Sequence, residues 1–158
     1  MRRRLTARVL LFDPNGRILL MKGRLPSAPA GPGNWFTVGG GAAPGEGVLE
    51  AAAREIVEET GFTAFELGPV VWRREGPLDL GAETVWMDEH YVIARCASGD
   101  PVRHGWQADE QAFIDDIRWW THAELLATDE RVWPPDLAEL LGDILAERLP
   151  PEPISIRW

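Results

Sequence analysis

One stretch of the sequence, residues 35–61, most limits what this chain can fold into. It opens with Trp35–Val38, which predicts a short strand, and continues through three consecutive glycines at 39–41. Gly47–Thr60 has no proline and no internal glycine, and Gly61 stands where helices favour a left-handed residue, so the pattern predicts a helix. The chain is therefore expected to pass from a strand through a glycine-rich loop into a helix packed on a sheet.

The predicted helix has two unlike faces. Its three glutamates Glu55, Glu58 and Glu59 fall together on the face opposite the expected core. The residues expected to form the buried face are Leu49, Ala53, Ile56, Val57 and Thr60. Three carboxylates on one helix face are either a solvated acidic surface or a set of hard oxygen ligands for Mg²⁺ or Mn²⁺.

The rest of the sequence predicts a mixed α/β (α+β) domain with helices packed on a sheet. Strands are expected at 5–12, 17–22, 69–75, 84–96 and 113–120, with a hairpin turn at 13–16 and a loop at 26–34. Residues 97–110 are expected to form a polar loop. Thr121–Glu124 resembles a capping box that opens a short helix, and a last helix begins near Pro135 and ends before Pro150.

Composition limits the size, the partners and the compartment of the protein. With 158 residues the chain is expected to form one domain over 1–158, with a short tail at 150–158. A single cysteine excludes a disulfide framework and a four-cysteine zinc site. The net charge of −9 disfavours stable nucleic-acid binding, although a divalent cation can still bring in a small anion. No apolar run is long enough to cross a bilayer, so we expect a cytoplasmic monomer or homodimer without a membrane partner.

A longer motif decides between the two interpretations of the acidic helix. From Gly40 the sequence runs Gly, five residues, Glu46, seven residues, Arg54-Glu55-Ile56, one residue, Glu58-Glu59, one residue, Gly61-Phe62. It resembles the Nudix box, G-x5-E-x7-R-E-U-x-E-E-x-G-U with U apolar, at every fixed position. Two flanking segments are also similar to that family: residues 35–40, with Val38 where proline is usual, and the run from Arg118 to Leu125. The resemblance covers about residues 5–148.

The resemblance to Nudix hydrolases implies a fold, a reaction and a set of site residues. The implied fold is an α/β/α sandwich with helices on both faces of a mixed sheet. The implied enzyme uses Mg²⁺ or Mn²⁺ to cleave the pyrophosphate bond of a nucleoside diphosphate linked to another moiety. By the same resemblance, Glu55, Glu58 and Glu59 are metal ligands and catalytic carboxylates, and the Gly39 carbonyl adds a ligand. Arg54 and Glu46 match the pair that orients these glutamates.

The general base stays open, because family members use either a box glutamate or a carboxylate elsewhere. Outside the box, Glu110 in the polar loop is the first candidate and Asp116 the third. The second is Glu89, which interrupts an apolar row, faces an apolar surface or a pocket, and is also a candidate substrate contact. Cations are expected near the substrate phosphates: Lys22 and Arg24, and as weaker candidates Arg73, Arg74 and Arg95.

The substrate and two alternative functions also stay open. The sequence does not decide among nucleoside triphosphates, nucleotide sugars and dinucleoside polyphosphates as the small phosphoanhydride substrate. A non-catalytic Nudix-like module that binds a nucleotide metabolite is one alternative, and an isomerase on the same scaffold is another. The complete box favours the hydrolase.

Overall fold

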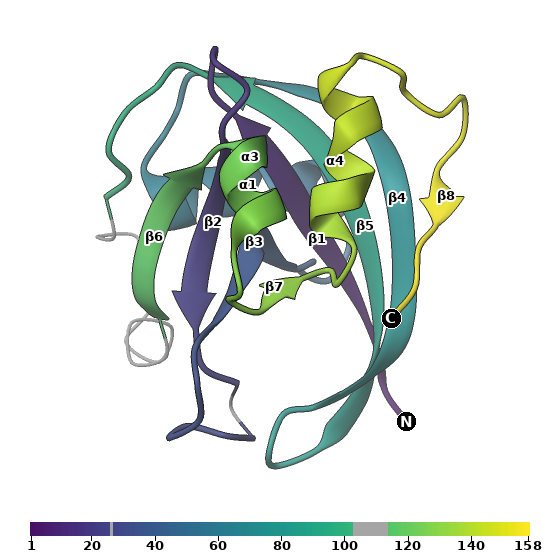
Figure 1. Cartoon of the computed structure of the whole chain (residues 1–158). Coiled ribbons are helices and arrows are strands. Elements are labelled where there is room, and N and C mark those ends of the chain that lie inside the picture. Colours follow the sequence, from purple (N-terminus) through teal and green to yellow (C-terminus); the bar gives the residue numbers. More distant parts are fainter. Residues whose placement is uncertain (26, 103–113) are drawn as a thin grey trace.

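The computed structural model describes residues 1–25, 27–102 and 114–158 (Figure 1). Its elements, in chain order, are β1 Arg3–Phe12, β2 Ile18–Gly23, β3 Asn34–Gly41, α1 Val48–Thr60, β4 Phe65–Asp79, β5 Thr84–Cys96, β6 Ile114–Trp120, α3 His122–Ala127, β7 Val132–Trp133, α4 Leu137–Leu145 and β8 Ile154–Ser155. No helix in the described part of the chain is both long and apolar enough to cross a membrane.

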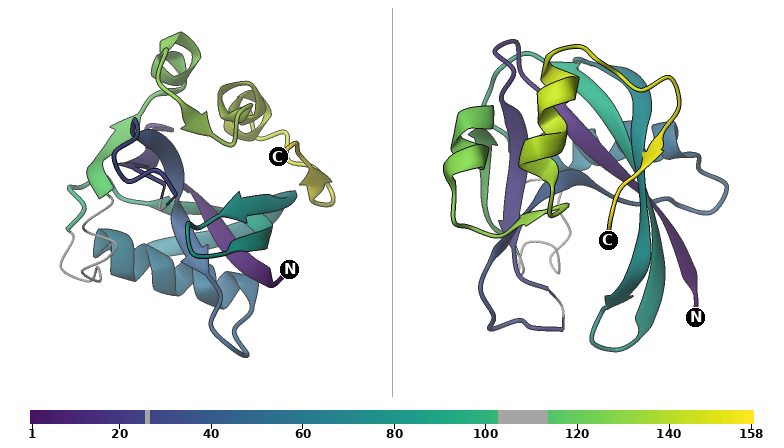
Figure 2. Two further views of the ribbon diagram at one scale, coloured as in Figure 1. Left: turned by 90° about the horizontal axis from the view of Figure 1, so that it is seen from below. Right: turned by 45° about the vertical axis from the view of Figure 1, so that its right-hand side comes forward.

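The strands form one mixed sheet in the order β6-β2-β3-β1-β5-β4-β8, and β7 pairs with β3. The central strand β1 runs antiparallel to β3 and parallel to β5, and its register with β5 extends from Arg3–Trp86 to Phe12–Arg95. Helix α1 lies on one face of the sheet, and α3 and α4 lie on the other (Figure 2). This arrangement confirms the predicted α+β fold with helices on both faces.

Two hydrophobic cores lie on the two faces of the sheet. Ala7, Val9 and Leu11 of β1 pack in the core that also contains α1. Leu10 and Phe12 pack in the core that contains residues of α3 and α4. The strand is therefore buried on both faces over this stretch, as its nearly continuous apolar run predicted.

The predicted hairpin turn at 13–16 is confirmed and is held by Asp13. Its Oδ1 accepts hydrogen bonds from the backbone N–H groups of Asn15 and Arg17, at 3.0 and 2.8 Å. Its Oδ2 lies 2.6 Å from the Arg17 Nε. Burial alone would raise the Asp13 pKa, but these hydrogen bonds outweigh burial and hold the pKa below its ordinary value.

The predicted burial of the α1 faces was right for Ile56 and Thr60, which are fully buried, and wrong for four other residues. Leu49 and Val57 are exposed, whereas Glu55 and Glu59 keep only 8% and 6% of their surfaces in contact with solvent. The helix packs on the sheet through Ala51, Ala52 and Ile56, and the next positions around the helix turn the two glutamates toward β3. These small alanines let the helix approach closely, so both carboxylates are covered by the sheet rather than by water.

Several strand bounds also differ from the predictions. β4 extends over Phe65–Asp79 instead of 69–75, and β3 continues through all three glycines at 39–41. The short strands β7 and β8 were not predicted. The capping box of Thr121 and Glu124 is present, with hydrogen bonds in both directions at the start of α3.

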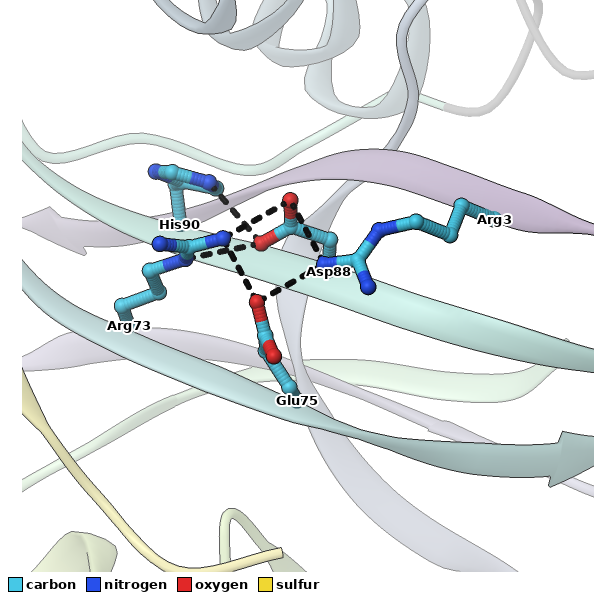
Figure 3. A network of polar contacts seen from close by, with 5 residues as sticks. All are labelled: Arg3, Arg73, Glu75, Asp88 and His90. Carbon is cyan, nitrogen blue, oxygen red and sulfur yellow. Dashed lines mark hydrogen bonds and ion pairs between the residues drawn. The ribbon is translucent and has the colours of Figure 1, made fainter.

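A polar network joins three neighbouring strands near one end of the sheet (Figure 3). Asp88 of β5 receives Arg73 Nε at 3.0 Å and His90 Nε2 at 3.0 Å, and Arg3 bonds to Glu75 at 2.9 Å. Burial would raise the Asp88 pKa, but the neighbouring Arg73, His90 and Arg3 lower it. Arg73 is thus held between two acidic side chains of β4 and β5.

Candidate metal and diphosphate site

The box helix meets the glycine-rich end of β3 through its two buried glutamates. The backbone N–H of Gly39 donates a hydrogen bond to Glu59 Oε2 at 3.1 Å. A Cβ atom at Gly40 would overlap the carboxylate of Glu55, and one at Gly39 would overlap the carbonyl oxygen of Ala7. Gly39 also has a φ of 142°, a conformation that other residues rarely adopt. The consecutive glycines are therefore what lets two carboxylates lie directly on a strand.

Arg54 links the glutamates of this segment. Its Nε and Nη2 donate to the two oxygens of Glu46 at 2.9 and 2.8 Å, and Nη2 also reaches the carbonyl of Gly41 at 3.0 Å. Its Nη1 donates to Glu55 and Glu58, each at 3.1 Å. The bidentate bond from Arg54, with a bond from the Ala43 N–H, lowers the pKa of Glu46 to about 2. Arg54 therefore fixes the loop before α1 to the acidic face of the helix.

Glu55 and Glu59 are two carboxylates buried near each other. Burial, and then the nearby Glu55, raise the pKa of Glu59 well above its ordinary value. A cation bound beside two neighbouring carboxylates relieves the repulsion between their charges. Glu55, Glu58 and Glu59 and the carbonyl of Gly39 offer hard oxygen atoms, the kind of donor that Mg²⁺ and Mn²⁺ prefer.

In the structure, two of these glutamates, Glu55 and Glu58, accept hydrogen bonds from Arg54. Among the described residues, no three His, Cys, Asp or Glu side chains are gathered as a ready metal cage. Glu55 and Glu58 are instead turned toward Arg54. The donor set fits a divalent cation in its chemistry: three carboxylates come from α1, and the Gly39 carbonyl comes from β3.

A second polar cluster lies beside the box, around Glu89 of β5. Glu89 is 3% exposed. Its Oε1 accepts from Arg8 Nε at 3.1 Å, and its Oε2 accepts from Arg74 Nη1 at 3.0 Å and from the Tyr91 hydroxyl at 3.1 Å. Two cations and a hydroxyl thus compensate a carboxylate that would otherwise be costly to bury.

Arg8 connects this cluster with the box. Burial lowers the Arg8 pKa, but the charges of Glu89, Tyr91 and Glu59 outweigh burial and raise it, which places Arg8 in the field of both glutamates. Apart from its Nε bond to Glu89, the guanidinium makes no hydrogen bond within residues 1–25, 27–102 and 114–158. Its terminal nitrogens are therefore available to an anion.

Arg8 also borders a cavity of about 360 Å³ between strands β1, β3, β4 and β5. The lining combines apolar and aromatic side chains with charged ones, three arginines and one glutamate, as expected of a pocket for an anionic small molecule. The residues that line it are Arg8, Gly23, Arg24, Leu25, Asn34, Phe36, Thr37, Arg74, Leu78, Glu89, Tyr91, Trp133 and Trp158.

Of the side chains predicted to bind the substrate phosphates, some line the cavity and others do not. Arg24 and Arg74 line the cavity, and Arg24 Nη1 donates to the carbonyl of Pro29 at 2.7 Å. Lys22 does not line it and instead pairs with Glu130 at 2.9 Å. Arg95 lies over the ring of Phe12, bordering a different hollow.

The candidate bases outside the box are also separated. Glu89 is buried in the cluster described above, and Asp116 is exposed, with its Oδ1 on the N–H of Ile117 at 2.8 Å. Glu110 lies outside the described residues.

The sequence analysis missed Arg8, Trp133 and Trp158 as site residues. One signal was available: Arg8 is the sole charged residue between Leu5 and Phe12, in a strand that is otherwise mostly apolar. A charge at that place must have a partner or a ligand. For the two tryptophans nothing local in the sequence indicated a pocket.

Comparison with known proteins gives the family. The model of the NUDIX domain matches residues 2–141. The chain is 34% identical over 128 residues to an RNA pyrophosphohydrolase of Caulobacter vibrioides, which covers 70% of this chain and 67% of that protein. It is also 34% identical over 143 residues to an isopentenyl-diphosphate Delta-isomerase of Nocardia farcinica, covering 84% and 74%.

A solved structure shows the same fold. A NUDIX hydrolase from Nitrosomonas europaea superposes with a TM-score of 0.63 over 94% of this chain and 92% of that chain, at 19% identity. Together with the family match, the complete box and its placement on α1, this shows that the chain belongs to the Nudix family.

Proposed function

We propose that the protein hydrolyses, with Mg²⁺, the pyrophosphate bond of a nucleoside diphosphate linked to another moiety. One observation carries the proposal: Arg8 lines a cavity large enough for a small molecule, and on β1 it is paired with Gly39, whose N–H binds Glu59 of the box. A substrate held in the cavity would thus present its phosphates to the box through a cation of the protein.

Glu55, Glu58, Glu59 and the Gly39 carbonyl would hold Mg²⁺ or Mn²⁺. When bound, such a cation neutralises charge on phosphate oxygens and lowers the pKa of a bound water. Arg54, held by Glu46, sets the positions of Glu55 and Glu58 before the cation arrives.

The other side chains bind and orient the substrate. Arg8 neutralises a phosphate oxygen with its terminal nitrogens, and Glu89 holds the Arg8 guanidinium in place through Nε. Because Glu89 already accepts three hydrogen bonds, we assign it this positioning role rather than that of the base. The base that takes the proton from water is then Glu58, the most exposed of the three box glutamates on α1, or Glu110.

The test is a substrate panel with Mg²⁺, followed by ³¹P NMR. It contains nucleoside triphosphates, a nucleotide sugar, a dinucleoside polyphosphate, a 5′-triphosphorylated RNA and isopentenyl diphosphate. We expect cleavage of a small nucleotide with release of a monophosphate, and loss of cleavage in Glu58→Gln but not in Arg148→Ala, an exposed control.

Other outcomes would overturn the proposal. Binding without cleavage of any nucleotide would make the protein a sensing module. Rearrangement of isopentenyl diphosphate without phosphate release would make it an isomerase. Preferred cleavage of the RNA would contradict the small substrate and the absence of stable nucleic-acid binding. The cytoplasmic location and the monomeric or dimeric state stay predictions.

A further inference from the structure

We propose that Trp158 determines substrate specificity: its indole forms the wall of the cavity on which a planar ring of the substrate stacks. The inference rests on the proposed function, because it takes the cavity beside Arg8 as the place of the group attached to the diphosphate. It adds a contact from the segment after α4, which lies outside the box and outside the region matched by the family model.

The segment that carries Trp158 is fixed along β4. β8 pairs with β4 in parallel, with Ile154 beside Trp72 and Ser155 beside Arg73. The pairing continues past the strand through two hydrogen bonds, from the Ile156 N–H to the Arg73 carbonyl at 2.9 Å and from Arg74 Nε to the Arg157 carbonyl at 3.2 Å. Trp158 is therefore held at one place on the edge of the sheet.

An ion pair fastens the same segment to the start of α4. Arg157 donates from Nε and Nη2 to the two oxygens of Asp136, at 2.6 and 2.9 Å. The two residues lie 21 positions apart in the chain, so this bond ties the segment to the helix layer as β8 ties it to the sheet. The pairing of β8 with β4 and the Arg157–Asp136 ion pair therefore both fix the backbone of this segment.

The indole of Trp158 lies on the inner surface of β4. The guanidinium carbon of Arg74 is 4.1 Å from the ring centroid, in a cation–π contact. A Cβ atom at Gly76 would overlap the Cγ and Cδ2 atoms of the indole, so the ring can lie there only because residue 76 has no side chain. The indole is partly exposed and lines the cavity together with Arg74.

The order of strands places the ring contact and the phosphate contact at opposite sides of the cavity. Arg8 is on β1, Glu89 and Tyr91 are on β5, and Arg74 and Gly76 are on β4, in the sheet order β1-β5-β4. A substrate with its phosphates near Arg8 and Glu59 would extend across β5 toward β4. Its ring would then meet Trp158, which offers a flat aromatic surface of the kind on which nucleobases stack.

The experiment compares binding of a probe with a ring and a probe without one. Guanosine 5′-monophosphate and ribose 5-phosphate are titrated, with Mg²⁺ present, by isothermal calorimetry or NMR into wild type and four variants. Trp158→Ala removes the ring, Trp158→Phe keeps a smaller one, Gly76→Ala displaces the ring without changing residue 158, and Ile154→Ala is an exposed control in the same segment.

We expect Trp158→Ala and Gly76→Ala to weaken binding of the guanosine nucleotide about 10-fold or more, the loss typical of a removed stacking partner. Trp158→Phe should recover most of the affinity, Ile154→Ala should match wild type, and ribose 5-phosphate should bind all five proteins alike. With the best hydrolysed substrate, Trp158→Ala should raise KM about 10-fold with little change in kcat, because stacking far from the reacting phosphorus is equal in ground and transition states.

Two results would overturn the inference. In the first, Trp158→Ala binds the nucleotide as well as wild type does, which would mean that the indole does not contact the ligand. Tighter binding by this variant would count in the same way, because it would mean that the indole occupies the place of the ligand. In the second, both probes lose affinity equally, which would make the segment a structural brace. If Gly76→Ala does not fold, the pair Trp158→Ala and Trp158→Phe still decides. Failure of the proposed function is a separate result, because wild type would then cleave no nucleotide of the panel.

Discussion

The Nε of Arg8 lies 3.1 Å from Oε1 of Glu89, and this bond joins two halves of the molecule that are 81 residues apart in sequence. The same bond also links the cluster around Glu89 at the cavity to β1, the strand beside the glycines that precede the box helix. Glu89 belongs to the buried cluster at the cavity, while Arg8 feels the charge of Glu59 in the box. In the proposed function, the Arg8 guanidinium would link the metal site to the cavity.

Glu89→Gln should destabilise the protein by about 3–5 kcal/mol, because it leaves Arg8 and Arg74 without the negative charge that both contact. Denaturant unfolding at neutral pH measures the effect. Glu139→Gln, an exposed acid on α4, should change the unfolding free energy by less than about 0.5 kcal/mol. Equal, small effects of the two substitutions would show that the charge of Glu89 is not needed to stabilise the buried Arg8 and Arg74.

Millimolar Mg²⁺ or Mn²⁺ should raise the melting temperature by several degrees, because a ligand bound only to the folded state stabilises it. The double substitution Glu55→Gln with Glu59→Gln should remove most of this rise. Without metal, Glu59→Gln alone should not lower the melting temperature, because burial and Glu55 already disfavour its charged form. A full metal-dependent rise in the double variant would place the cation elsewhere.

Glu58→Gln should lower kcat about 100-fold or more and leave the melting temperature without metal nearly unchanged, because its effect is on charge in the transition state. Its side chain is 42% exposed and its bond in the structure is to Arg54, so the fold does not depend on it. Steady-state kinetics with the best substrate, alongside a thermal melt, separates the two effects. A variant keeping more than about a tenth of the wild-type kcat would contradict the role.

Glu110→Gln should lower kcat about 100-fold if the base is outside the box, which is the range for removal of a general base. The rate should then rise with pH in wild type and lose that dependence in the variant. Glu89→Gln is the informative partner, since its effect should appear in stability and KM rather than in the pH profile. A silent Glu110→Gln would leave the box glutamates as the source of the base.

Asp13→Asn should destabilise the protein by about 1–3 kcal/mol at pH 7, because three donors of the hairpin turn lose a charged acceptor. The folded pKa of Asp13 is below its ordinary value of 3.8, so this stabilisation is complete above that value. It is lost as the pH falls through the folded pKa. The gap between wild type and variant in unfolding free energy should therefore close below about pH 4, whereas Asp143→Asn, in an exposed ion pair, should show almost no gap at any pH.

Much of the fold could be predicted because its signals are local. The turn at Asp13, the end of α1 at Gly61 and the capping box at Thr121 each depend on a few neighbouring residues, and each is present. The box itself has fixed spacing along one helix, so the position of its carboxylates on α1 follows from the sequence.

The rest depended on contacts between distant segments. A helical wheel assigns Glu55 and Glu59 to water, and only the glycines of β3 reveal that a strand can cover them. β8 has two residues and no periodicity, and its existence depends on the exposed edge of β4. Trp158 became part of the cavity for the same reason, and no pattern near it in the sequence indicates that.

The parallel pairing of β1 with β5 has a consequence for synthesis of the protein. Residues 3–12 leave the ribosome before their partners at 86–95, which follow more than 70 residues later. Until β5 is made, β1 can pair only with β2 and β3. The N–H and C=O groups on the other edge of this apolar strand then have no partner strand. Such non-local pairing slows folding, so the half-made chain is the stage at which this protein is most exposed to aggregation and most dependent on chaperones.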